Sequence, residues 1–96
     1  MVALSTVVAA ASEQVSCYLG GEAAILNLKN GAYYALDPVG ARVWSFLAVP
    51  RRLSEVRDEI PREYDVEAER CESDLLGLVG ALADEGLAEI VGEPTG

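Results

Sequence analysis

The sequence contains no histidine, few bases and no long apolar run, and each absence argues against a class of function. Without histidine, the chain lacks the commonest general base and the commonest zinc ligand. Its two cysteines, Cys17 and Cys71, lie far apart and form no CxxC pair, which argues against zinc and against Cys/His catalysis. There is also no phosphate-binding glycine loop and no nucleophile with a base beside it. We therefore expect no enzyme activity, no metal and no cofactor.

Only 7 lysines and arginines stand against 16 aspartates and glutamates, which gives a formal net charge of -9. Such a chain repels the phosphates of nucleic acids and anionic lipids, and it favours cationic partners. The first residues, MVALSTVVAAAS, are apolar but carry no base and are shorter than the ~20 residues that span a membrane. We expect no nucleic-acid partner, no membrane span and a cytoplasmic protein with reduced cysteines, a Cys17–Cys71 disulfide being the alternative.

The chain has the size and composition of one domain. Ninety-six residues, 51% apolar and 24% charged, are enough for a single hydrophobic core. The expected organisation is a partly ordered apolar arm over residues 1–14, a domain over 15–91 and a polar tail over 92–96.

Three short segments with β-branched and aromatic residues precede residue 37. They are VSCYL (15–19), AAILNLK (23–29) and AYYALD (32–37), and Gly20-Gly21 and Asn30-Gly31 separate them. Asn-Gly predicts a type I′ turn, because both central positions of that turn need positive φ. Two consecutive hairpins, and so a three-stranded antiparallel meander, are expected. Alternation predicts Leu26, Leu28, Tyr34 and Leu36 on the core face, and Ile25, Asn27, Tyr33 and Ala35 on the other.

Three helices should follow the meander. The pair Asp37-Pro38 predicts a helix that has Asp37 as its N-cap and proline at its first position. This helix should end near Ala48 to Pro50. A second helix should begin at Ser54, until Pro61 bends or breaks it before Tyr64.

The third helix should start after Asp65 or Val66 and run to Glu85, where Gly86 can adopt the left-handed conformation. The fold class expected is therefore α+β and winged-helix-like, with one sheet covered by helices. The core stripe of the third helix is expected to be Cys71, Leu75, Leu78, Val79 and Leu82, with Leu76 and Ala83 to one side. Leu87, Ile90 and Val91 could form a short closing segment.

The third strand, residues 32–37, should form an open edge of the sheet. It leads directly into a helix, and no later strand is obviously available to pair with its outer side. The strand contains two tyrosines, and it lacks the lysine or proline that commonly protects an edge until position 38. Such an edge is either an aggregation liability or a place where a partner chain adds a strand.

Two long runs carry a family resemblance. GGEAAILNLKNGAYYALDPVGARVW, followed by RRLSEVRDEIPREYDVEAERCESDLLGLVGALADEGL, resembles the PqqD-like family of RiPP recognition elements, winged-helix-like domains that bind leader peptides of ribosomally made, modified peptides. More narrowly, the chain is similar to the stand-alone recognition proteins of lasso-peptide clusters, whose partner is a transglutaminase-like cysteine peptidase that removes the leader. The resemblance covers residues 15–91 and is most specific at NGAYYALDPVGARVW and YDV. Pro61 and the apolar amino-terminal arm depart from the family pattern.

This resemblance implies a non-catalytic module on which a precursor leader peptide lies along the third strand and against the third helix, for delivery to the peptidase. An aromatic residue and a proline of the leader are the implied anchors. A charged residue in place of Leu76 should weaken leader binding without unfolding the domain. The implied contacts are Ala32, Tyr33, Tyr34, Ala35 and Leu36 on the strand, apolar Cys71, Leu75, Leu76 and Val79 on the helix, and polar Arg70, Glu72 and Asp74.

Two other functions remain open. A winged-helix DNA-binding regulator would share the strands and helices, since a common fold does not fix function. Residues 67–85, however, carry one base, Arg70, against six acids, whereas a helix that reads duplex DNA is usually basic. A small hydrolase or metal enzyme is the third hypothesis, and turnover without both cysteines, or stoichiometric metal, would support it.

Overall fold

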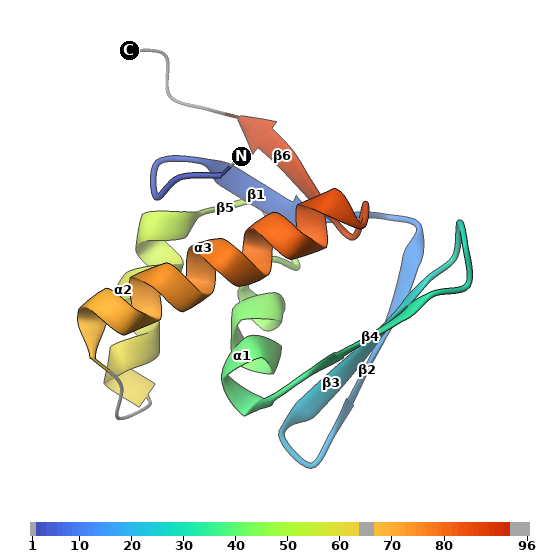
Figure 1. The fold of residues 1–96 in the computed structure, drawn as a ribbon, viewed down its shortest axis with the longest axis horizontal. Coiled ribbons are helices and arrows are strands. Elements are labelled where there is room, and N and C mark those ends of the chain that lie inside the picture. Colours follow the sequence, from blue (N-terminus) through green and yellow to red (C-terminus); the bar gives the residue numbers. More distant parts are fainter. Residues whose placement is uncertain (1, 64–66, 93–96) are drawn as a thin grey trace.

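The computed structural model describes residues 2–63 and 67–92, which form three helices and two antiparallel sheets of three strands each (Figure 1). The expected meander followed by three helices is present, and a second sheet accompanies it. The elements in chain order are β1 (Val7–Ala10), β2 (Gln14–Leu19), β3 (Glu22–Asn27), β4 (Tyr33–Leu36), α1 (Pro38–Phe46), β5 (Arg51–Arg52), α2 (Leu53–Glu63), α3 (Ala68–Asp84) and β6 (Ala88–Gly92).

The first sheet is the meander, in the order β2-β3-β4. The predicted type I′ turn at Asn30-Gly31 is wrong, because Gly31 has φ +72° while no non-glycine residue among those described has positive φ. Instead, residues 28–31 form a longer loop, closed by hydrogen bonds from Gly31 N to Asn27 O and from Asn27 N to Ala32 O, both 2.8 Å. The Asn30 Oδ1 accepts from Ala32 N and so supports the same loop.

The pairing of β3 with β4 shows which side of β3 faces the core. Ile25 pairs with Tyr34, so odd-numbered residues of β3 share a face with the even-numbered residues of β4. The prediction for β4 is confirmed, since Leu36 is buried and Tyr34 half-buried, whereas the prediction for β3 is inverted. Ile25 and Asn27 are buried, and Leu26 and Leu28 are exposed.

Asn27 connects the meander to the end of α3. Its side chain is 3% exposed, its Nδ2 donates to Glu85 O at 2.9 Å, and its Oδ1 accepts from Lys29 N at 2.9 Å. Since a buried amide is retained only where its polar atoms are paired, these bonds explain why a polar residue takes the core face here. Asn27 therefore holds the base of the hairpin against α3.

We expect Asn27→Ala to lower the free energy of unfolding by about 1–3 kcal/mol, because it removes two hydrogen bonds that a buried side chain makes. Urea unfolding followed by Trp44 fluorescence would measure this loss. Asn30→Ala is the matched control, since it makes the same chemical change in an exposed position of the same loop and should cost about 0.5 kcal/mol or less. Equal losses in the two variants would contradict a stabilising role for the buried amide.

The start of α1 confirms the predicted cap. Asp37 has extended backbone and its Oδ1 accepts from Gly40 N at 2.7 Å, and Pro38 occupies the first helical position. The helix ends at Phe46, slightly before the expected position. Trp44 is buried, and its Nε1 donates to the Ser16 Oγ at 2.8 Å, which attaches α1 to β2.

The observed bounds of α2 and α3 agree with the expected bounds within a few residues. α2 continues past Pro61 to Glu63, and Tyr64 lies outside the described residues. At the end of α3, Gly86 has φ +75°, as predicted, with bonds from Gly86 N to Ala83 O and from Leu87 N to Leu82 O. These two bonds form a Schellman motif, which turns the chain from α3 into β6.

The second sheet has the order β5-β1-β6, so its middle strand comes from the expected arm. Val8 pairs with Arg51 on one side and with Ile90 on the other. Val2, Val8 and Ala11 are buried. The expectation of a partly ordered arm is therefore wrong for these residues, and the folded unit begins before residue 15. Strand pairs this far apart in the sequence leave no local signal from which they could be predicted. β6 does overlap the short closing segment that was expected from Leu87, Ile90 and Val91.

Candidate functional site

β4 is one of the two edge strands of the first sheet, and it leads into α1. Among residues 2–63 and 67–92, no strand pairs with its outer side. Since Asn27 N donates to Ala32 O, the alternation of antiparallel ladders directs the backbone of Tyr34 toward β3. The N–H and C=O groups of Tyr33 and Ala35 then point outward, and an extended chain could bond to them.

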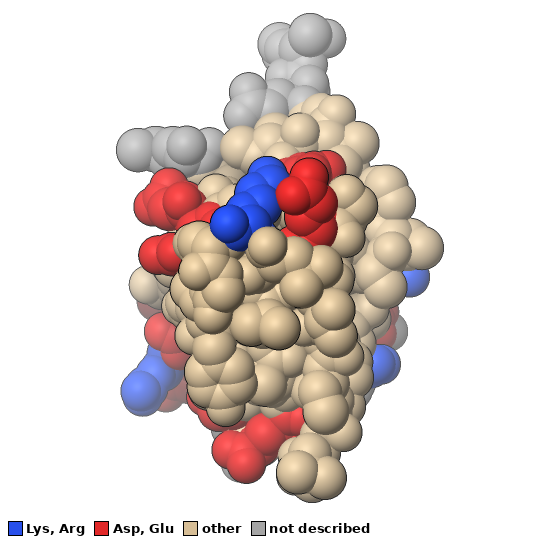
Figure 2. Space-filling model, turned by 90° about the vertical axis from the view of Figure 1, so that its right-hand side faces the viewer, with Lys and Arg blue, Asp and Glu red and all other residues tan. Residues whose placement is uncertain are grey.

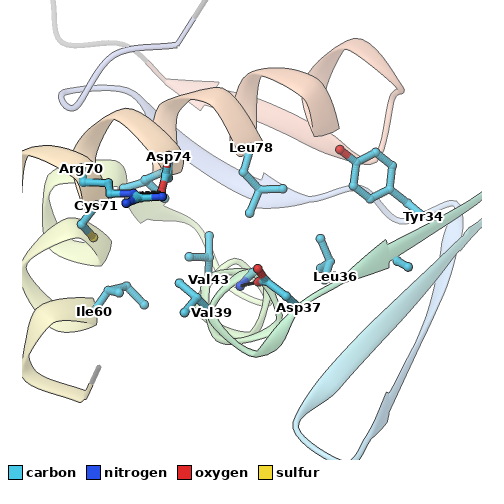
Figure 3. A pocket seen from close by; sticks show the side chains of 13 residues that line it. Tyr34, Leu36, Asp37, Val39, Val43, Ile60, Arg70, Cys71, Asp74 and Leu78 are labelled. Atoms are coloured by element: carbon cyan, nitrogen blue, oxygen red, sulfur yellow. Dashed lines mark hydrogen bonds and ion pairs between the residues drawn. The ribbon is translucent and has the colours of Figure 1, made fainter. Parts of the chain in front are cut away.

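A pocket of about 510 Å³ adjoins this edge and lies between β4, α1, α3 and the side chain of Ile60 on α2 (Figure 3). Leu78 points into it from α3, while Val39 and Val43 face it from α1 (Figure 3). Most of the side chains that line it are apolar. The full lining is Tyr34, Ala35, Leu36, Asp37, Val39, Gly40, Val43, Ile60, Arg70, Cys71, Asp74, Leu75 and Leu78.

Charged groups lie at the rim of the pocket. Arg70 Nε is 3.8 Å from Asp74 Oδ2, and both side chains are largely exposed, so this pair contributes little to stability. The Asp37 carboxylate already accepts a hydrogen bond from Gly40 N as the N-cap of α1. Two carboxylates against one guanidinium leave a slightly negative rim around an apolar interior, which favours a neutral or cationic ligand with apolar anchors.

The structure brings seven of the twelve residues implied by the resemblance to the pocket. Their common feature is a position on β4 or on one side of α3. They are Tyr34, Ala35, Leu36, Arg70, Cys71, Asp74 and Leu75.

The other five lie elsewhere. Ala32 precedes β4, and the side chain of Tyr33 is 70% exposed on the face of the sheet turned away from the helices. Glu72 lies 3.6 Å from Arg57 of α2, Leu76 packs against the core, and Val79 is fully buried. On α3, residues 70, 71, 74, 75 and 78 share the pocket side, whereas 72, 76 and 79 are rotated away from it.

Sequence reasoning missed six lining residues, four of which come from α1 and its cap. Because β4 leads directly into α1, the first turns of that helix must lie beside the edge. Gly40 allows this approach, since an added Cβ would lie 3.2 Å from Asp37 Oδ1 and 3.4 Å from Leu36 Cβ. Leu78 lies four residues after Asp74 and therefore on the same side of α3, so this spacing could have predicted that Leu78 lines the pocket. The missed residues are Asp37, Val39, Gly40, Val43, Ile60 and Leu78.

Cys71 is the cysteine that lines the pocket, and its environment lowers its reactivity. It is a buried free thiol, and burial, with a smaller contribution from Asp74, raises its pKa against the opposing effect of Arg57. A thiol of raised pKa holds less of the reactive thiolate at neutral pH. Cys17 is also free, and it is exposed.

We expect iodoacetamide at pH 8 to modify Cys17 readily and Cys71 much more slowly in the native protein, since alkylation needs an accessible thiolate. Mass spectrometry of tryptic peptides after timed quenching would give both rates. In denaturant the two thiols should react at similar rates. Native labelling of Cys71 as fast as that of Cys17 would contradict the described burial.

Neither a membrane span nor a metal cluster is found in the described part of the chain. None of its helices combines the length and the apolar character that crossing a membrane requires. The search over the same residues finds no group of three histidine, cysteine or acidic side chains placed to hold a metal ion.

Comparison with known proteins agrees with the family resemblance. The sequence profile described as "Coenzyme PQQ synthesis protein D (PqqD)" matches residues 22–88. The solved structure described as "TbiB1 in Complex with the TbiA(beta) Leader Peptide" aligns with a TM-score of 0.79 and 35% identity, over 88% of this chain and 99% of that one. No curated protein matches the chain. The α+β fold is thereby confirmed, and the chain belongs to the PqqD family.

Proposed function

We propose that this protein is a non-catalytic RiPP recognition element that binds the leader region of a precursor peptide. One observation carries the proposal: an open β4 edge lies beside an apolar pocket. The chain with this feature is 35% identical to TbiB1, whose structure is described as a complex with a leader peptide.

The leader binds by adding a strand to the sheet. Its backbone bonds to the outward groups of Tyr33 and Ala35, and these bonds fix the register. Because side chains alternate along a strand, every second leader residue faces α3 and the pocket. A volume of about 510 Å³ lies within the range of small-ligand sites and can hold more than one large side chain. An aromatic residue and a proline of the leader are the proposed anchors.

The finer proposal is that the precursor is of the lasso-peptide class and that this chain delivers it to a separate transglutaminase-like cysteine peptidase. The NGAYYALDPVGARVW block supports the class by resemblance. Cleavage requires a nucleophile with a base, whereas the pocket offers only a buried thiol of raised pKa and the chain has no histidine. A second protein must therefore supply the chemistry. The free thiols support a cytoplasmic location as part of this proposal.

Fluorescence polarisation with a labelled leader from the precursor encoded beside this protein tests the proposal. Saturable binding in the micromolar to nanomolar range, about -8 to -12 kcal/mol, is expected, and a scrambled leader should not bind. A labelled DNA duplex in the same assay tests the alternative function, DNA binding. No saturable leader binding, or duplex binding with a steep salt dependence, would refute a leader-binding role.

A further inference from the structure

The two ends of the leader pocket differ in charge. Arg70 and Asp74 lie together on α3 at one end, and Tyr34 of β4 stands at the other, with Val43 and Leu78 between them (Figure 3). The interior between the two ends is apolar, so it holds an anchor of the leader without regard to charge. A leader that occupies this pocket therefore meets a neutral end and a charged end.

The acidic surplus of the chain is spread unevenly over its surface. Figure 2 shows a face with a continuous uncharged area in its middle and charged side chains above and below. At physiological salt, screening limits the reach of an exposed charge to about 8 Å, so distant acids contribute little to a contact in the pocket. The charged groups at the rim, rather than the net charge of -9, therefore decide which side chain the pocket selects.

Asp74 is a carboxylate at the charged end that can change its partner at little cost. Its ion pair with Arg70 is long, at 3.8 Å, and the side chains of Asp74 and Arg70 are 73% and 80% exposed, so water screens the pair. Arg57 of α2 does not compete for Asp74, because it is already engaged by two other carboxylates, Asp58 at 3.0 Å and Glu72 at 3.6 Å. A base supplied by a ligand can therefore replace Arg70 beside Asp74.

The charge of Asp74 also acts inside the pocket. Cys71 lines the pocket, and burial first, then the carboxylate of Asp74, raises the pKa of its thiol against the opposing effect of Arg57. A carboxylate that raises the pKa of a neighbouring thiol makes the local potential negative. The same potential stabilises a cationic side chain that enters this end of the pocket, and it repels an anionic one.

We infer that Asp74 is a specificity-determining residue of the leader site and that it pairs with a lysine or arginine of the leader. This inference rests on the proposed function, and it narrows the substrate to leaders that carry a base near an apolar anchor. Since alternate side chains of an added strand face α3, the base and the anchor stand an even number of residues apart.

Asp74→Asn tests the inference, because it removes the charge and keeps the shape of the side chain. We expect the leader peptide encoded beside this protein to bind about 3- to 5-fold more weakly at roughly 20 mM salt, with a smaller loss at roughly 500 mM salt. Asp84→Asn is the matched control, since it makes the same change at an exposed position of α3 that does not line the pocket. Its affinity should stay within about 1.5-fold of the wild type. Fluorescence polarisation gives the affinities, and circular dichroism should show both variants folded.

Arg70→Gln should have the opposite effect. It removes the group that competes for Asp74, so the leader should bind about 2-fold more tightly. A double-mutant cycle then identifies the residue of the leader. Replacing one particular lysine or arginine of the leader by glutamine should weaken binding to the wild type by the same 3- to 5-fold, roughly, and should change binding to Asp74→Asn by less than about 1.5-fold.

Three results would overturn the inference while leader binding stands: wild-type affinity in Asp74→Asn at low salt, a loss equalled by Asp84→Asn, or no base of the leader that is coupled to residue 74. Weaker binding by Arg70→Gln together with tighter binding by Asp74→Asn would also overturn it, because the rim would then select an acidic residue of the leader. Failure of the proposed function looks different, since the leader would then not bind the wild-type protein.

Discussion

Leu78→Glu should weaken leader binding at least about 30-fold, which corresponds to about 2 kcal/mol. Leu78 lines the pocket from α3 and points into it (Figure 3). The change removes apolar surface that an anchor of the leader would cover, and it places a carboxylate where that anchor must displace water. Glutamate is a good helix former, so α3 itself should persist. Isothermal titration with the leader peptide would measure the loss.

Leu76→Glu is the matched control, with the same replacement two positions earlier on α3. Leu76 is half-buried against the core and does not line the pocket, so leader affinity should change by less than about 3-fold. Thermal unfolding of both variants should confirm that they are folded at the titration temperature. A larger loss of affinity at Leu76 than at Leu78 would contradict this site and restore the expectation drawn from the sequence.

Ala35→Pro should weaken leader binding roughly 10- to 100-fold, because it removes an outward N–H and leaves a carbonyl of the added strand without a donor. Proline is tolerated on an edge strand where the N–H faces solvent, and Tyr34 before it is already in a strand. The fold should therefore survive, which circular dichroism would check. Fluorescence polarisation with the labelled leader would measure the affinity.

Ala35→Ser keeps the backbone donor and adds only a small hydroxyl, so its leader affinity should stay within about 2-fold of the wild type. The difference in leader affinity between the two variants therefore measures the contribution of the N–H of residue 35. Wild-type affinity in Ala35→Pro would show that the leader does not pair with β4 at this position.

Local signals in the sequence were sufficient for the elements that build the site. The cap at Asp37, the proline after it and the left-handed Gly86 each act within a few residues, and each prediction agrees with the structure. The open edge at β4 also followed from the sequence, because the strand enters a helix without a later partner.

Long-range geometry could not be predicted in the same way. The face of β3 is an exception, because the expected two-residue turn and the observed four-residue loop both pair odd-numbered residues of β3 with even-numbered residues of β4, so the face predicted for β4 already determined that of β3. The pairing of β1 with β5 and β6 joins segments more than forty residues apart. On α3, the pattern placed both Leu78 and Val79 in the core, and the resemblance placed Val79 at the groove, whereas Leu78 lines the pocket and Val79 is fully buried. Packing of α3 against α2, β6 and α1 decides that rotation.

Amide hydrogen exchange, resolved by residue with NMR, tests the central claim most directly. The amides of Tyr33 and Ala35 should exchange quickly in the free protein, since no strand covers the outer side of β4 in the described chain. Saturation with the leader should slow both strongly, and the amides of β2, at the opposite edge of the sheet, should not change. Unchanged exchange at Tyr33 and Ala35 in a saturated complex, or new protection along β2 instead, would contradict strand addition at β4.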